Sequence, residues 1–102
     1  MSRKSREKGK RVEREVAHIF GTNRNPADGH THTDIHTDKY AIEVKARKSL
    51  PEWIHGAMQQ AIEDSRDRIP LVVLVQSKVG ALPIRYVLMR LEDFVKEESN
   101  VE

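Results

Sequence analysis

The run LVVLV at residues 71–75 constrains the fold of this chain more than any other stretch. It is continuous, aliphatic and rich in β-branched residues, which is typical of a strand buried on both faces. Such a strand lies in the middle of a sheet. We therefore predict a sheet that is covered by helices on both sides.

Two helices are predicted from apolar residues that recur on one face. The first runs from about Lys8 to Phe20 and ends at Gly21. The second opens at residues 50–52, where a proline is tolerated in the first turn, and ends near Arg68. The inner faces are formed by Val12, Val16, Ala17, Ile19 and Phe20 in the first helix and by Ile54, Met58, Ala61, Ile62 and Ser65 in the second.

The other predicted elements follow from period-two patterns and from turn residues. The loop 22–29 is rich in Asn, Gly, Pro and Asp, with room for a short strand near Asn23 and Arg24. Further strands are predicted at 31–37, 40–46 and 85–89, and a short last helix at 91–98.

This order of elements predicts an α/β fold with a mixed sheet flanked by helices. A chain of 102 residues has room for one domain, so we expect a single domain at 1–102. We expect a basic arm at 1–9, for which disorder is an open alternative, and a frayed tail at 98–102. Only 37% of the residues are hydrophobic, so a homodimer is expected as a way to add buried area.

Composition excludes several classes of protein. The absence of cysteine excludes disulfides and thiolate zinc sites. No apolar run approaches the ~18 residues that a membrane span needs, and no apolar signal segment follows the basic start. We expect a cytoplasmic protein without membrane contact, and a phage- or virus-encoded protein that acts inside its host cell is an open alternative.

The net charge of +2 conceals a strong asymmetry. Residues 1–14 hold seven Lys and Arg against two Glu, whereas residues 92–102 hold five acids against Lys96. A basic arm of this kind gains free energy from the counterions that a polyphosphate releases, although a solvated tail has the same composition. The arm consists of Arg3, Lys4, Arg6, Lys8, Lys10, Arg11 and Arg14.

A hairpin is predicted around Asp38-Lys39, either as a two-residue turn or as the middle of a four-residue loop. A three-residue loop would reverse the faces, and Asp-Lys is not a favoured turn pair. Alternation places Ile35, Ile42 and Val44 toward the core, and Asp34, Glu43, Lys45, His32 and His36 on the opposite face, with Asp34 opposite Glu43.

Two directly opposed carboxylates repel each other, and the apolar residues prevent the strands from slipping. Exposure to water, protonation of one carboxyl or a bound cation could relieve the repulsion. Mg²⁺ suits a site of one or two carboxylates that keeps several waters. Lys45 could then orient or deprotonate a water, or stabilise charge on a phosphorane. An ordinary solvated strand face is the alternative.

The spacing Asp34, eight residues, Glu43-Val44-Lys45 lies between a helix with KGKRVEREV and a helix with QQA. This arrangement resembles the PD-(D/E)xK nuclease superfamily, and within it the archaeal-type Holliday-junction resolvases and their phage relatives. The resemblance spans roughly residues 8–76. Thr33 replaces the proline of the motif, the loop GHTHTD departs from the family's Gly/Ser-rich segment, and the chain is shorter than a typical resolvase.

The resemblance implies a restriction-endonuclease-like core and a homodimeric, metal-dependent endonuclease that hydrolyses phosphodiesters in branched DNA. Asp34, Glu43 and the carbonyl of Val44 would bind Mg²⁺ or Mn²⁺, and Lys45 would serve the attacking water. Glu13 would complete the metal site or support it, and Gln60 would face it. The residues expected to bind DNA are Arg24, Lys48 and, from the arm, Arg3, Lys4, Arg6, Lys8, Lys10 and Arg11.

Several alternatives stay open. The helical pattern alone does not choose between Glu13 and its neighbour Glu15. Trp53 could stack on a base, pack in the core or contact a second copy. A non-catalytic nucleic-acid-binding module with a nuclease-like fold is the second functional candidate. A small metal-binding or interaction protein built around His30, His32 and His36 is the third.

Overall fold

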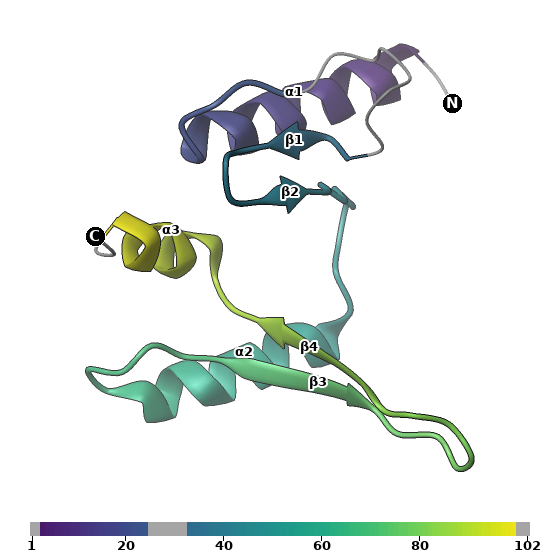
Figure 1. Ribbon diagram of the computed structural model, residues 1–102, viewed down its shortest axis with the longest axis vertical. Coiled ribbons are helices and arrows are strands. Elements are labelled where there is room, and N and C mark those ends of the chain that lie inside the picture. The colour runs from purple at the N-terminus through teal and green to yellow at the C-terminus, as the bar shows by residue number, and fades with distance from the viewer. Residues whose placement is uncertain (1–2, 25–32, 100–102) are drawn as a thin grey trace. The chain divides into compact units, whose positions relative to one another are not determined.

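The computed structural model describes residues 3–24 and 33–99 (Figure 1). Residues 31 and 32 of the first predicted hairpin strand, and the end of the tail from residue 100, lie outside this range. Contacts divide the chain into two compact units, Met1–Lys48 and Ser49–Glu102. The single domain stays a prediction.

The first unit contains α1 (Arg3–Ile19), β1 (Ile35–His36) and β2 (Ala41–Ile42) (Figure 1). Helix α1 begins at Arg3 and not at about Lys8 as predicted, so residues 3–9 of the basic arm are helical. Regular backbone bonding continues because Arg, Lys and Glu are good helix formers. The predicted stop at Gly21 is confirmed, since its φ of 74° is left-handed and its N–H donates to the His18 carbonyl at 2.9 Å.

The predicted hairpin register is confirmed. Ile35 pairs with Ile42 in an antiparallel ladder, and the Thr37 N–H donates to the Tyr40 carbonyl at 2.8 Å. The strands are shorter than predicted, at two residues each. The expected strand near Arg24 is present as a single antiparallel bridge from Arg24 to Ile35.

The turn between these strands forms without glycine because a side chain accepts hydrogen bonds from the backbone N–H groups of the turn. The Thr37 hydroxyl oxygen accepts from the Lys39 N–H at 3.2 Å and from the Tyr40 N–H at 2.9 Å. A threonine at the start of a turn commonly bonds the backbone in this way. Thr37 therefore explains how an Asp-Lys pair, which is disfavoured on its own, connects the strands.

The core of the first unit is small. Ile35 and Ala17 are fully buried, and Ile42 and Val44 are half-buried on the same side of the hairpin as Ile35. This pattern confirms the predicted alternation. Most of the predicted inner face of α1 is confirmed by half-buried residues, but Ile19 is exposed because the helix ends there.

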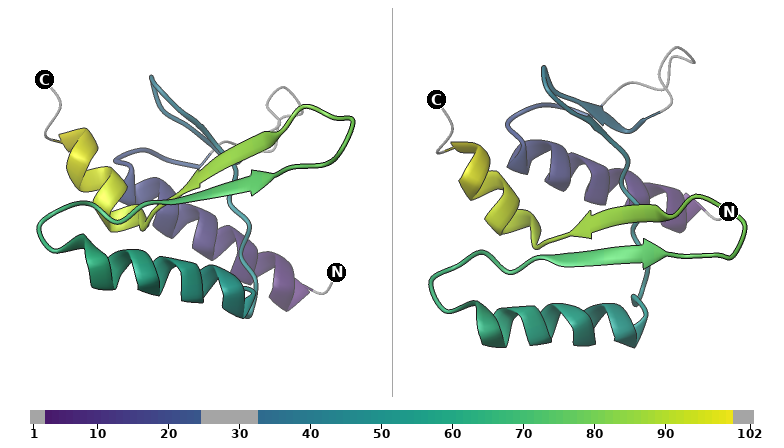
Figure 2. Two further views of the ribbon diagram at one scale, coloured as in Figure 1. Left: turned by 90° about the horizontal axis from the view of Figure 1, so that it is seen from below. Right: turned by 60° about the horizontal axis from the view of Figure 1, so that its bottom comes forward.

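The second unit contains α2 (Glu52–Ser65), β3 (Val72–Gln76), β4 (Ile84–Leu88) and α3 (Leu91–Ser99). Helix α2 packs along β3, as both views of Figure 2 show. Its predicted inner face is confirmed, because those residues are half-buried whereas Glu52, Trp53 and Gln60 are exposed. None of the three helices has the length and apolar character that crossing a bilayer requires, for the part of the chain described.

The prediction for the run at 71–75 is wrong in this structure. Among the described strands, β3 pairs only with β4, and Val73 and Val75 are exposed. Val72 and Leu74 alternate with them and are half-buried. A continuous apolar run shows that both faces can be buried, but it does not supply the layers that bury them.

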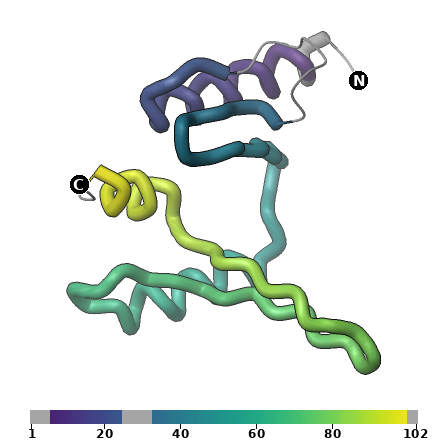
Figure 3. The backbone as a smooth tube through the Cα atoms, viewed as in Figure 1, coloured from purple at the N-terminus to yellow at the C-terminus, as the bar shows by residue number. Residues whose placement is uncertain are grey.

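Two antiparallel sheets of two strands each therefore stand where one mixed sheet is expected, within residues 3–24 and 33–99. The β3–β4 connection extends beyond the strands as an open loop (Figure 3), with Val79 and Leu82 almost fully exposed. The coarse α/β class is confirmed: three helices accompany these sheets.

Ile35→Ala tests the small core of the first unit. We expect this change to lower the free energy of unfolding by roughly 2–5 kcal/mol, because it leaves a cavity at the most buried large side chain. Urea unfolding measures the loss. Val79→Ala is the matched control and should change stability by less than about 0.5 kcal/mol, since Val79 is fully exposed. Equal losses in both variants would contradict this assignment of the core.

Candidate functional site

Asp34 closes the open end of the hairpin. Its Oδ2 accepts a hydrogen bond from the Val44 N–H at 2.8 Å, and the bond is partly buried. The ladder from Ile35 to Ile42, extended by one residue, sets Asp34 opposite Glu43. A charged acceptor makes this bond stronger than a neutral one. The carboxylate is therefore held at the backbone between Glu43 and Lys45.

Glu43 and Lys45 lie on the face that the alternation predicts for them. The Lys45 Nζ is 3.1 Å from the Glu43 Oε2, and both side chains are exposed. An exposed ion pair of this kind contributes little to stability, because water screens it. The amine is consequently available to move to another anion near the hairpin.

The predicted repulsion between the two acids is relieved by protein groups. The Val44 N–H compensates Asp34, and the Lys45 amine compensates Glu43. These two donors differ from the water, the protonation and the cation that the sequence suggests as remedies. The hairpin is thus electrostatically acceptable before any ion binds.

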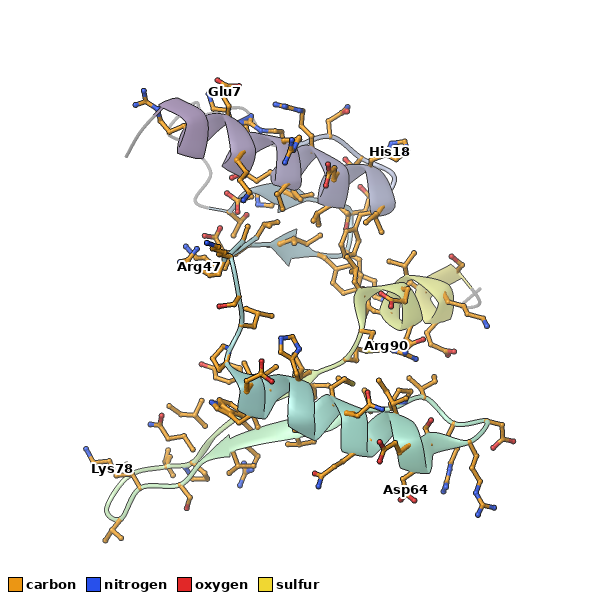
Figure 4. All side chains as sticks on the ribbon, turned by 180° about the vertical axis from the view of Figure 1, so that it is seen from behind. Glu7, His18, Arg47, Asp64, Lys78 and Arg90 are labelled. Atoms are coloured by element: carbon orange, nitrogen blue, oxygen red, sulfur yellow. The ribbon has the colours of Figure 1, made fainter. Side chains whose placement is uncertain are left out.

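A cationic groove of about 680 Å³ lies beside these residues. One wall is the first half of α1, and the other is the segment that follows β2. Arg47 belongs to this segment and lies nearer to Glu7, at the start of α1, than to His18, near its end (Figure 4). A groove lined by one sign of charge concentrates counterions of the other sign. Its charged lining consists of Arg6, Lys8, Lys10, Arg24, Lys45, Arg47 and Lys48, with Glu13 as the acid.

The groove lining contains part of the set predicted to bind DNA. Arg11 does not line it and is instead 4.0 Å from Glu15 on the exposed side of α1. The side chains of Arg3 and Lys4 lie outside the described part of the structure. Sequence reasoning missed Arg47 as a groove residue. The basic run KARK at 45–48 is the signal that identifies it.

Glu13, and not Glu15, lines the groove. The Arg24 Nε is 3.3 Å from the Glu13 Oε2, and the two side chains retain only 24% and 25% exposure. Glu15 is exposed. Glu13 therefore faces the groove, where it is engaged with a cation from the bridge next to β1.

The residues near Val44 include oxygen donors of the kind that a hard divalent cation prefers. Asp34, Glu43 and the Val44 carbonyl offer oxygen atoms, and Mg²⁺ typically takes one or two carboxylates and completes its shell with waters and phosphate oxygens. No group of three or more His, Cys, Asp or Glu side chains is placed to hold a metal within the described ranges. An open magnesium site of this kind requires fewer protein ligands than such a group provides.

Three further candidates have exposed side chains. Gln60 is exposed on α2, which belongs to the second unit. His36 is exposed, and its Nε2 lies 2.6 Å from the Thr33 Oγ1. His30 and His32 lie outside the described residues. The exposure of Trp53 excludes it from the core of its unit.

Asp34→Ala tests the bond that closes the hairpin. We expect hydrogen exchange of the Val44 amide to accelerate and stability to fall by about 1 kcal/mol, because this amide loses its acceptor. Asp34→Asn should retain most of the protection, since its amide oxygen can still accept. Asp38→Ala, in the exposed turn, is the control. Unchanged Val44 exchange in Asp34→Ala would show that the bond does not form in solution.

The chain matches no protein-family model, no curated protein and no solved structure. The features of the chain that bear on function are its own: the carboxylates of Asp34 and Glu43 next to Val44, the adjacent Lys45 and the cationic groove.

Proposed function

We propose that this protein is a metal-dependent endonuclease that hydrolyses phosphodiesters in DNA, with branched DNA of the Holliday-junction type as substrate. The observation that carries the proposal is the position of Val44 and Lys45, which line the cationic groove and adjoin Asp34 and Glu43. A groove with seven cations suits a phosphate backbone. The low apolar content of the chain supports a homodimer.

The groove residues supply binding and orientation. Arg6, Lys8 and Lys48 lie along its two walls and would contact successive phosphates of the bound strand. Mg²⁺ or Mn²⁺, held by Asp34, Glu43 and the Val44 carbonyl, would supply Lewis acidity and lower the pKa of bound water. The two carboxylates would thus place the positive charge of the cation beside the groove, next to the phosphodiester to be cut.

Lys45 is the residue proposed to act on the reacting atoms. Its amine leaves the exposed pair with Glu43 and donates hydrogen bonds to the attacking water or to the phosphate oxygens. The water oxygen bonds to phosphorus as the bond to the 3′ oxygen breaks. A proton passes to that oxygen, so the products are a 5′-phosphate and a 3′-hydroxyl.

A non-catalytic nucleic-acid-binding module is the second candidate. It is favoured by the finding that Asp34 and Glu43 each have a donor from the protein. The two candidates predict different behaviour for Asp34→Ala. In a binding module this variant keeps salt-dependent DNA binding and there is no cleavage to lose, whereas in the nuclease it abolishes cleavage and can tighten binding by removing a negative charge.

Cleavage assays on plasmid and on synthetic four-way junctions test the proposal. We expect wild-type protein to cleave with Mg²⁺ or Mn²⁺ and to stop with chelator, and the cut ends should be substrates for DNA ligase. Asp34→Asn, Glu43→Gln and Lys45→Met should each lower the rate by about 100-fold or more, since each removes a group that stabilises the transition state.

Two conservative changes outside the site control for this assay. Asp38→Asn and Glu52→Gln alter exposed acids by the same chemistry and should cleave like wild type. Salt-dependent binding without cleavage by wild-type protein in either metal would eliminate the nuclease and leave the binding module.

A further inference from the structure

Arg24 differs from the other cations of the groove in how firmly it is held. Its backbone forms the bridge to Ile35, the most buried large residue, and its side chain is paired with Glu13. It is half-buried, whereas the other six basic residues of the lining are exposed. Arg24 is therefore the cation whose position the fold determines most closely.

A cation held in place binds a phosphate differently from a mobile one. Exposed lysines and arginines lose side-chain freedom when they contact a ligand, which offsets part of the gain. A guanidinium has five N–H donors in a planar fork that matches phosphate oxygens. Fixing the fork in advance reduces the entropy lost on binding.

We propose that Glu13 is a positioning residue, which holds the Arg24 guanidinium at the groove to receive a DNA backbone phosphate. This inference rests on the proposed DNA-binding function. It assigns Glu13 to substrate binding through the 3.3 Å contact with Arg24. The resemblance to nucleases implies a different role, in which Glu13 completes or supports the metal site.

The sign of the effect on binding separates these roles. Glu13 is the only acid that lines the groove within the described residues, so removing its charge raises the positive potential there. Electrostatics alone therefore predicts tighter DNA binding after the change. Positioning predicts weaker binding, because Arg24 is released from its place.

Binding of a fluorescently labelled four-way DNA junction, measured by anisotropy with chelator present, tests the proposal without metal or cleavage. We expect Glu13→Ala to weaken binding by roughly two- to tenfold, the equivalent of one hydrogen bond. Glu13→Gln removes the same charge but keeps an oxygen for the Arg24 Nε–H, so it should restore part of the affinity. Glu15→Ala, on the exposed side of α1, should not weaken binding.

A double variant identifies Arg24 as the route of the effect. Arg24→Gln should weaken binding and reduce the slope of log affinity against log salt by about 0.9, the value of one lost phosphate contact. Adding Glu13→Ala to Arg24→Gln should cause no further loss. If a thermal melt shows that Glu13→Ala is unfolded, Arg24→Lys is used in its place. This variant should lose affinity but keep the salt slope, because the positive charge stays while the planar fork of donors is removed.

Three results would overturn the inference. The first is that Glu13→Ala binds the junction as tightly as wild type or more tightly. The second is that adding Glu13→Ala to Arg24→Gln lowers the affinity by the same factor as Glu13→Ala alone. The third, in the replacement test, is wild-type affinity in Arg24→Lys. These results leave the proposed function intact, whereas failure of wild-type protein to bind the junction even at low salt removes both.

Discussion

The burial of Ile35 is the constraint on which the rest of the first unit depends. Since side chains alternate across a strand, burying Ile35 turns Asp34 away from the core and sets the register with Ile42. The same residue forms the bridge to Arg24, which brings that guanidinium to the groove. The burial of this one side chain thus determines which charged groups lie close together in the first unit.

Hydrogen bonds and ion pairs then determine how the charged side chains at the surface of the first unit are arranged. The acids near the groove are each engaged with a donor: Asp34 with a backbone N–H, Glu43 with Lys45, and Glu13 with Arg24. The engaged acids lower the net positive charge around the groove, and they remain at the surface that a polyanion would approach. This arrangement combines attraction for phosphate with carboxylate oxygens that suit a hard cation.

The sequence predicts features that local chemistry determines. The hairpin register follows from alternation, and the stop at Gly21 follows from the need for a left-handed residue. It does not predict the exposure of Val73, because an apolar run carries no information on which layers cover it. A helical pattern also does not predict that Glu13 pairs with Arg24, because Arg24 is brought to Glu13 by its backbone bridge to the hairpin. The candidate residues Asp34, Glu43 and Lys45 could be named from a sequence motif, but their hydrogen-bond and ion-pair partners could not.

We propose that Asp34 and Glu43 hold a divalent cation beside the groove. Titration of Mn²⁺ followed by NMR measures this directly, because the paramagnetic ion broadens the amide signals of nearby residues. We expect the signals of residues 34 and 43–45 to disappear first, and Asp34→Asn to abolish this selectivity. Broadening confined to the acidic helix α3 (Leu91–Ser99), with the hairpin signals unaffected, would contradict the proposal.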